Sequence, residues 1–232
     1  MPPPAAHRVR DARSNADIEV TVETLVLSHF YSNCYLVALP HNGRTLVIDP
    51  AEAQPVAERL QARGWTAAGI VVTHGHLDHS GGALALRRLT GAPVAMHRED
   101  AGYLTNVEWA HTMGFEIEAG TPDRFLDEGD EVALEGGDER VVFRVLFTPG
   151  HSPGHITLVT DGFCFPGDVL FAGGVGRVDF PGGSAAALKR SIDERLLTLP
   201  DDTVVYPGHG APTTIGAERR TNPFLTGALD IG

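Results

Sequence analysis

Four metal-binding side chains fall within six residues of this 232-residue chain: His74, His76, Asp78 and His79. The apolar run Gly69–Val72 before them is typical of a short buried strand, and the leucine spacing after them is typical of a helix. The motif therefore lies on a tight strand-to-helix loop. The first two histidines alternate like residues that leave a strand, so both can point the same way, whereas the adjacent Asp78 and His79 must diverge. This arrangement suits two neighbouring metal ions better than one.

Three distant segments repeat one pattern. Each follows an apolar, strand-like run, turns at a Pro-Gly pair and then presents one ligand-type residue, namely His151, Asp168 or His209. A strand that ends in a glycine-containing turn can place its next side chain at the edge of the sheet. Imidazole and carboxylate groups together form a ligand set for zinc, iron or manganese. We therefore expect these strand ends to converge on a metal site.

The pattern HxHxDH, followed by a distant Gly-His, an Asp and a second Gly-His, resembles the metallo-β-lactamase-fold hydrolase superfamily from about Val20 to Pro223. Within that superfamily, the stretches Asn33–Leu36, Gly150–His155 and Gly176–Gly183 resemble the glyoxalase II-type branch, the hydroxyacylglutathione hydrolases. The resemblance implies two divalent transition metals, with zinc as the first expectation and iron or manganese as alternatives. It implies a first site of His74, His76 and His151, a second site of Asp78, His79 and His209, and Asp168 as the carboxylate that bridges both.

The order of elements indicates an α/β fold of four layers. Strands, a helix, further strands and a second helix suit an αβ/βα sandwich, in which two mixed sheets pack face to face with helices outside. The resemblance implies the same metallo-β-lactamase fold. We expect residues 18–232 to form one domain, and residues 1–17, which show no hydrophobic period, to form a mobile or loosely packed arm.

Composition narrows the function classes. A net charge of −12 argues against a nucleic-acid partner, since such proteins present a basic surface. No apolar run is long enough to span a membrane, and the N-terminus lacks the apolar core of a signal peptide, so we expect a cytoplasmic protein without a membrane partner. Two cysteines, Cys34 and Cys164, exclude a disulfide scaffold. The partner expected is therefore a small molecule.

A hydrolytic mechanism follows from the implied metal pair. Two dications lower the pKa of a bridging water towards about 7 and so supply hydroxide at neutral pH. Asp78 is the expected catalytic residue, because it can bind the second metal and orient that hydroxide. One metal stabilises the oxyanion that forms on the attacked carbonyl. A thiolate leaves without needing a proton, and no general acid is evident in the sequence. The leading hypothesis is a thioesterase similar to glyoxalase II.

Two alternative activities stay open. The stretch Arg177–Phe180 also resembles the persulfide dioxygenases, which keep one iron on the positions that match His74, His151 and Asp168. That family usually has cysteine where this chain has Val175. A lactonase, or another hydrolase of small esters, is the third hypothesis.

Several residues allow two interpretations. Trp109 and Phe115, in the aperiodic segment 105–123, either line the substrate pocket or pack into a small surface core, and packing is favoured. Arg177 either holds a substrate carboxylate or pairs with Asp179, and the pair is favoured. Asp49 is either a partner of the metal ligands or a turn residue. We expect His97 and His155 to be non-ligands.

Overall fold

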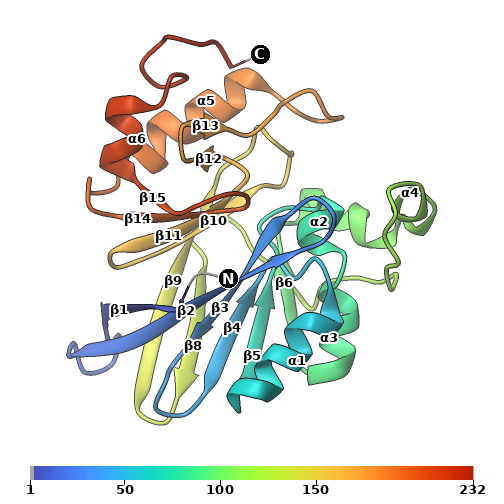
Figure 1. Cartoon of the computed structure of the whole chain (residues 1–232), viewed down its shortest axis with the longest axis vertical. Helices are drawn as coiled ribbons and strands as arrows, with labels where there is room; N and C mark the ends of the chain where they lie inside the picture. The colour runs from blue at the N-terminus through green and yellow to red at the C-terminus, as the bar shows by residue number, and fades with distance from the viewer. Residues whose placement is uncertain (1–2, 232) are drawn as a thin grey trace.

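A computed structural model describes residues 3–231 and shows two mixed β-sheets packed face to face, with helices on the outer surfaces (Figure 1). The first sheet has the strand order β1-β2-β3-β4-β5-β6-β7. Its pairings are antiparallel from β1 to β4 and parallel from β4 to β7. Its strands are β1 (Ala5–Arg10), β2 (Asp17–Leu27), β3 (Ser32–Ala38), β4 (Arg44–Ile48), β5 (Thr66–Val71), β6 (Val94–Met96) and β7 (Arg124–Phe125).

The second sheet has the order β15-β14-β11-β10-β9-β8, with one parallel pairing, between β11 and β14. Its strands are β8 (Glu131–Gly136), β9 (Glu139–Phe147), β10 (Ile156–Thr160), β11 (Phe163–Gly167), β14 (Val204–Pro207) and β15 (Thr213–Thr214). A separate small hairpin consists of β12 (Leu170–Phe171) and β13 (Gly174–Val175).

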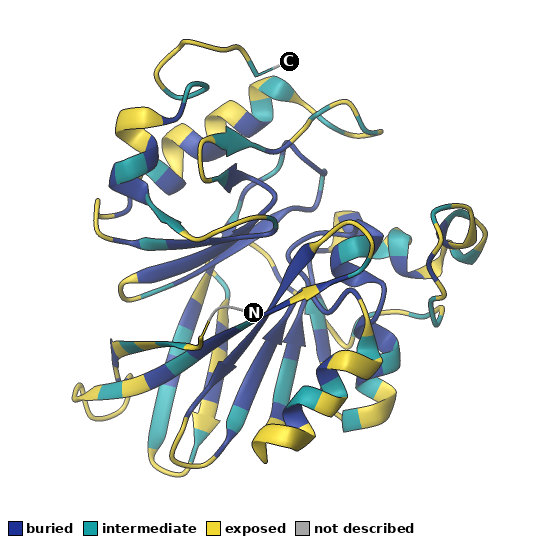
Figure 2. Ribbon diagram, viewed as in Figure 1, coloured by how far each residue is buried: buried dark blue, intermediate teal, exposed yellow. Residues whose placement is uncertain are grey.

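The helices complete the predicted four layers. Helices α1 (Ala53–Arg63) and α3 (Ala83–Thr90) cover the first sheet, and α5 (Ala185–Glu194) and α6 (Ile215–Thr221) cover the second, each with an exposed outer side (Figure 2). The remaining helices are short: α2 (Leu77–Ser80), α4 (Val107–Thr112) and the 3-10 helices η1 (Arg98–Thr105) and η2 (Leu196–Thr198). None of the helices in residues 3–231 combines the length and apolar character that crossing a membrane requires.

The core between the sheets is made by alternate residues of strands from both sides. Its largest buried members are aromatic and aliphatic side chains, among them Tyr35, Leu46, Phe143, Phe163 and Phe165. A second apolar cluster lies between the first sheet and its helices, and a third lies between the second sheet and its helices. Burial of this area is the main force that holds the layers together.

Residues 5–10 correct the expectation of a loose N-terminal arm. They form β1, which pairs antiparallel with β2 over six residues. Val9 is buried in the central core, and the His7 ring lies 2.6 Å from the Tyr206 hydroxyl. The strand was missed because its apolar signal is small: within β1 only Val9 is fully buried, as is typical of an edge strand.

Strand direction explains why the candidate ligands meet. Strands β4, β5 and β6 run parallel, so their carboxyl ends lie at one edge of the first sheet. Strands β9 and β11 are both antiparallel to β10, and β11 is parallel to β14, so these three also end at a common edge. The loops after β5, β9, β11 and β14 are the ones that carry the candidate metal ligands.

The role of β1 can be tested with a pair of substitutions. Val9→Asp places a carboxylate in the core and should lower the free energy of unfolding by about 3 kcal/mol. Arg8→Asp, on the exposed face of the same strand, should change it by less than about 0.5 kcal/mol. Urea unfolding measures both, and equal effects of the two changes would show that residues 5–10 do not pack as a strand.

Candidate metal centre

The seven predicted ligand residues lie at the shared edge of the two sheets. His74 follows β5, His76 precedes α2, and Asp78 and His79 lie within α2. His151, Asp168 and His209 follow β9, β11 and β14. Five of these residues are buried, whereas Asp78 and His209 are partly exposed. The cluster therefore has a closed side within the protein and an open side at these two residues.

The first donor set consists of three buried histidines, His74, His76 and His151. One ring nitrogen from each lies within 4.8 Å of the others. His76 Nδ1 is 2.8 Å from His151 Nε2. Nε2 of His74 is buried and has no hydrogen-bond partner. Two imidazole nitrogens that each lie about 2 Å from one ion are about 3 Å apart, so this spacing fits a shared metal.

The second donor set is Asp78, His79 and His209, whose donor atoms also lie within 4.8 Å of one another. His209 Nε2 is 3.2 Å from Asp78 Oδ2 and 3.3 Å from His79 Nε2. Two backbone contacts hold the loop of His209 in place. Asn33 donates its side-chain amide to the carbonyls of Pro207 and Gly210, one on each side of the histidine.

Asp168 lies between the two donor sets. Its Oδ2 is 3.5 Å from Nε2 of His151 on one side and 3.5 Å from Nε2 of His209 on the other. Its Oδ1 is 3.5 Å from His79 Nε2, is buried, and accepts no hydrogen bond. A carboxylate that faces both sets, with one oxygen left without a partner, fits the predicted bridging position.

Hydrogen bonds behind the donors fix the orientation of the rings. Asp49 Oδ2 lies 3.2 Å from His79 Nδ1, so His79 turns Nε2 towards the cluster. His151 Nδ1 donates to the carbonyl of Arg177 at 2.7 Å, so the Nε2 of His151 also faces the cluster. Partners of this kind select the ring nitrogen that binds a metal. Asp49 also accepts hydrogen bonds from the backbone and hydroxyl of Thr73, so it acts as a partner of the ligands.

The protonation preferences also fit bound cations. Burial, reinforced by His151, lowers the pKa of His76 to about 4, and burial lowers that of His74 well below its usual value. Burial alone would raise the pKa of Asp168, but the histidines around it, His79 first, lower it to about 2. Burial opposes protonation of His79, yet Asp78 and Asp168 outweigh it and raise that pKa. The carboxylates thus draw positive charge into the second donor set.

The two histidines that were expected to be non-ligands, His97 and His155, take part in hydrogen bonding or capping. His155 accepts from the backbone N–H of Asp168 at 3.1 Å and lies 3.2 Å from the Thr148 hydroxyl, as expected for a structural residue. His97 accepts from Glu99 N at the start of η1 and stacks on Phe147. Neither histidine belongs to a donor set in the described part of the chain.

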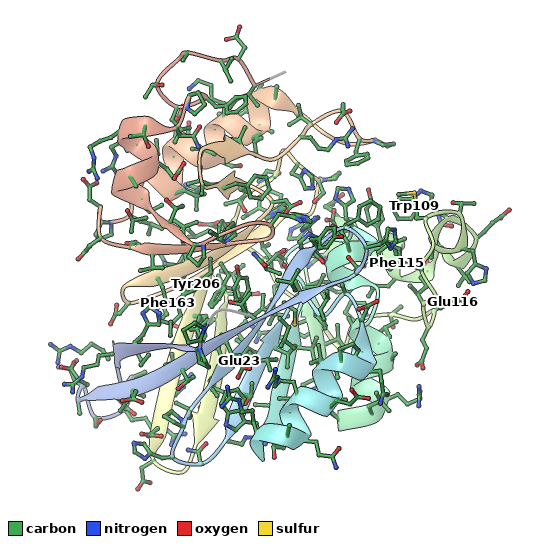
Figure 3. The ribbon with its side chains drawn as sticks, viewed as in Figure 1. Glu23, Trp109, Phe115, Glu116, Phe163 and Tyr206 are labelled. Atoms are coloured by element: carbon green, nitrogen blue, oxygen red, sulfur yellow. The ribbon has the colours of Figure 1, made fainter. Side chains whose placement is uncertain are left out.

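The proposed substrate-contact residues show the packing roles that the sequence favoured. Phe115 is buried against Leu77 of the metal loop, and Trp109 packs against the same small cluster (Figure 3). Arg177 forms a two-point ion pair with Asp179, and its guanidinium lies 4.3 Å from the centre of the Phe180 ring. A contact between these side chains and a substrate stays a prediction.

Three aromatic rings around the cluster were not predicted as site residues. The ring centroids of Tyr103 and Phe180 lie 5.5 and 5.0 Å from that of His76. The ring centroid of Phe171 lies 6.2 Å from that of His209. Phe180 belongs to the glycine-rich stretch that carried the resemblance, so it was open to detection. Tyr103 and Phe171 have no local sequence signal.

Comparison with known proteins agrees with this fold. Residues 27–209 match the model of the metallo-beta-lactamase superfamily, so the chain belongs to that superfamily. Together with the cluster of histidines and aspartates, this membership identifies a metal-dependent hydrolase that binds divalent metal ions.

Individual relatives narrow the branch. The chain is 37% identical to the hydroxyacylglutathione hydrolase GloC of Haemophilus influenzae over 212 residues, which are 89% of this chain and 98% of the relative. It is similar to the crystal structure of TTHA1623 in a di-iron-bound form, with a TM-score of 0.77, 37% identity and coverage of 88% and 100%. It is also similar to the BLEG-1 B3 metallo-beta-lactamase, with a TM-score of 0.80, 32% identity and coverage of 88% and 99%. The similarity to the hydroxyacylglutathione hydrolase supports the glyoxalase II-like branch.

The bridging position of Asp168 can be tested by metal content. Asp168→Ala should reduce the content from about two ions per chain to well below one, because both donor sets lose a shared ligand. His209→Ala should leave about one ion, since only the second set is disrupted. Elemental analysis of folded protein, checked by circular dichroism, measures both. Full metal content in the Asp168 variant would contradict the bridge.

Proposed function

We propose that this protein is a dinuclear, metal-dependent thioesterase similar to glyoxalase II. The observation that carries the proposal is the completeness of both donor sets, with Asp168 between them. An enzyme with a single ion would have no use for the second set of Asp78, His79 and His209. The similarity to a hydroxyacylglutathione hydrolase supports the thioester class.

The chain's own residues would hold the metal ions, orient the attacking water and leave one side of the site open to a substrate. The first set and Asp168 would hold one ion, zinc in the first instance, and the second set would share Asp168 to hold the other. Two divalent ions held there would lower the pKa of water towards about 7 and polarise a carbonyl. Asp78 lies at the open side, with its side chain 18% exposed. Its carboxylate can therefore bind an ion and accept a hydrogen bond from the attacking water.

An apolar rim supports a substrate with an apolar acyl or thiol group. Phe180 and Tyr103 lie beside His76, and Trp109 packs on Tyr103 with 5.5 Å between ring centres. The turn between β2 and β3 adds Phe30 and Tyr31, which are 42% and 74% exposed. That turn ends at Ser32, which forms a β-bridge with His209. Exposed apolar side chains gathered beside a reactive centre are typical of a substrate contact surface.

The arginine beside the candidate ligands is already engaged, which argues against strong binding of glutathione. Arg177 is paired with Asp179, and its carbonyl accepts a hydrogen bond from His151. Arg219 and Arg220 are paired with Asp201, which precedes β14, whereas His209 follows that strand. Glutathione carries two carboxylates that need cationic partners, and the chain has a net charge of −12. Binding energy from the glutathione part of a thioester should therefore be small.

The proposal also includes a cytoplasmic location and a small-molecule substrate, with neither nucleic acid nor membrane as partner. Arg177, Trp109 and Phe115 belong to it as substrate-contact candidates. Phe115 would act by supporting Phe30, on which it stacks with 6.0 Å between ring centres.

A substrate panel tests the thioester assignment. S-lactoylglutathione should be hydrolysed with a high KM, and thioesters of the same acyl group on a small neutral thiol should match or exceed its kcat/KM. The panel should include a lactone, a simple ester and a β-lactam, the last because of the similarity to the BLEG-1 enzyme. A strong preference for glutathione thioesters with a micromolar KM, typical of a dedicated enzyme, would contradict the weak glutathione contact.

Asp78→Asn should lower kcat by about 100-fold or more while KM changes little, because the residue is proposed to orient the attacking water. Steady-state kinetics with metal content measured on the same sample checks this. An unchanged kcat at full metal occupancy would exclude the orienting role.

The dioxygenase alternative predicts different results in the same preparations. Iron is compatible with this fold, since the TTHA1623 structure holds two iron ions. A dioxygenase would contain one iron and consume oxygen with a persulfide substrate. We expect no oxygen consumption, and a single iron with an empty second set would favour that alternative.

A further inference from the structure

Asp100 is a buried carboxylate outside the two donor sets. It lies in η1 and is fully buried. Its side chain accepts three hydrogen bonds, from Gly75 N at 2.8 Å, from Ser152 Oγ at 2.6 Å and from Gly154 N at 2.6 Å. Nothing in the proposed chemistry uses this residue, and its sequence context shows no motif.

The three donors flank the first set of histidines. Gly75 is the residue between His74 and His76, on the loop that leaves the first sheet. Ser152 and Gly154 follow His151, on the loop that leaves the second sheet. One carboxylate thus joins the two loops that bring these rings together across the interface between the sheets.

The backbone of η1 is packed tightly between the same two loops. A Cβ atom on Gly75 would collide with the ring of Tyr103 and would lie 2.8 Å from the Asp100 carbonyl oxygen. A Cβ atom on Gly154 would lie 2.6 Å from Asp100 N. Only glycine permits this approach at either position, so η1 and the two loops form one closely packed unit.

The separation of the loops decides how well the first set can hold an ion. His76 Nδ1 and His151 Nε2 lie 2.8 Å apart, and each ring is carried by a loop that Asp100 contacts. The His151 ring is also oriented by Arg177 O, which accepts a hydrogen bond from its Nδ1. The Asp100 hydrogen bonds join the His74–His76 loop to the residues after His151. They add to the backbone hydrogen bond from Ile156 N to Thr73 O and to the stacked rings of His74 and His155.

We propose that Asp100 is a positioning residue for the first donor set, which sets the spacing of His76 and His151 by joining their loops. The inference rests on the proposed metal centre. Residues that orient metal ligands from outside the coordination shell typically change metal affinity by about 10- to 100-fold when they are replaced.

The test measures metal affinity at the first set alone. In a His209→Ala background the second set is incomplete, so competition with a chelator reports the affinity of the first set. Asp100→Asn keeps the size of the side chain but turns an amide NH2 towards groups that donate hydrogen bonds. It should weaken zinc binding by about 10- to 100-fold. With Co²⁺ as the probe, the visible absorption bands should change, because the ligand geometry is altered.

Asp11→Asn is the matched control. Asp11 is also buried and accepts three hydrogen bonds, from the backbone N–H groups of Arg13, Ser14 and Arg140, at the turn between β1 and β2. The control should lower the melting temperature and leave the zinc affinity and the Co²⁺ spectrum unchanged. An equal loss of affinity in both variants would show that general stability, and not positioning, is responsible.

Ser152→Ala covers the case in which Asp100→Asn does not fold. It removes one of the three hydrogen bonds and should weaken zinc binding at the first set by a smaller factor. If the parent chain binds two ions, unchanged zinc affinity in the folded variants would overturn the inference about Asp100 and leave the proposed function standing. A parent chain that binds no metal would overturn the proposed function together with this inference.

Discussion

Apolar packing between the two sheets positions the functional groups of this protein. The rings of Tyr35, Phe165 and Tyr206 contact one another across the core, with centroids 5.0 to 5.4 Å apart. Tyr35 also donates its hydroxyl to the carbonyl of Pro207, at the start of the loop that carries His209. Because the ligand-bearing strands end at the same edge of each sheet, the packing of the sheets decides how far apart their donor loops lie. A change in that packing would move one half of the metal centre against the other.

Buried hydrogen bonds then set the direction of each donor. His79 is oriented by Asp49, and His151 by the carbonyl of Arg177, so that each presents Nε2 to the cluster. A buried polar group is costly unless it is paired. The unpaired His74 Nε2 and Asp168 Oδ1 are therefore the atoms whose chemistry most directly fits a bound cation. Under the proposed function, a substrate would enter at the open side of the cluster, at Asp78 and His209, beside the apolar rim.

The fold and the donor residues were accessible to prediction because their signals are local. The HxHxDH motif is compact, and the Pro-Gly turns directly follow apolar runs. Helix α1 likewise ends at a local signal, Gly64, which caps it with a left-handed backbone. Weak local signals failed in two places. Strand β1 exposes most of its side chains, and α4, a helix of six residues capped by Asn106, is too short to show a period.

Local sequence patterns were enough to identify the residues that could bind metal, their order and the superfamily of the chain. The distances among these residues, the partners that orient them and the rings that surround them depend on the folded arrangement of the whole chain. Asp100 illustrates the reason, since its hydrogen bonds to Gly75 and Gly154 join positions far apart in the chain. No local pattern encodes such a contact, because it arises only when both sheets have packed and brought the loops to the same edge.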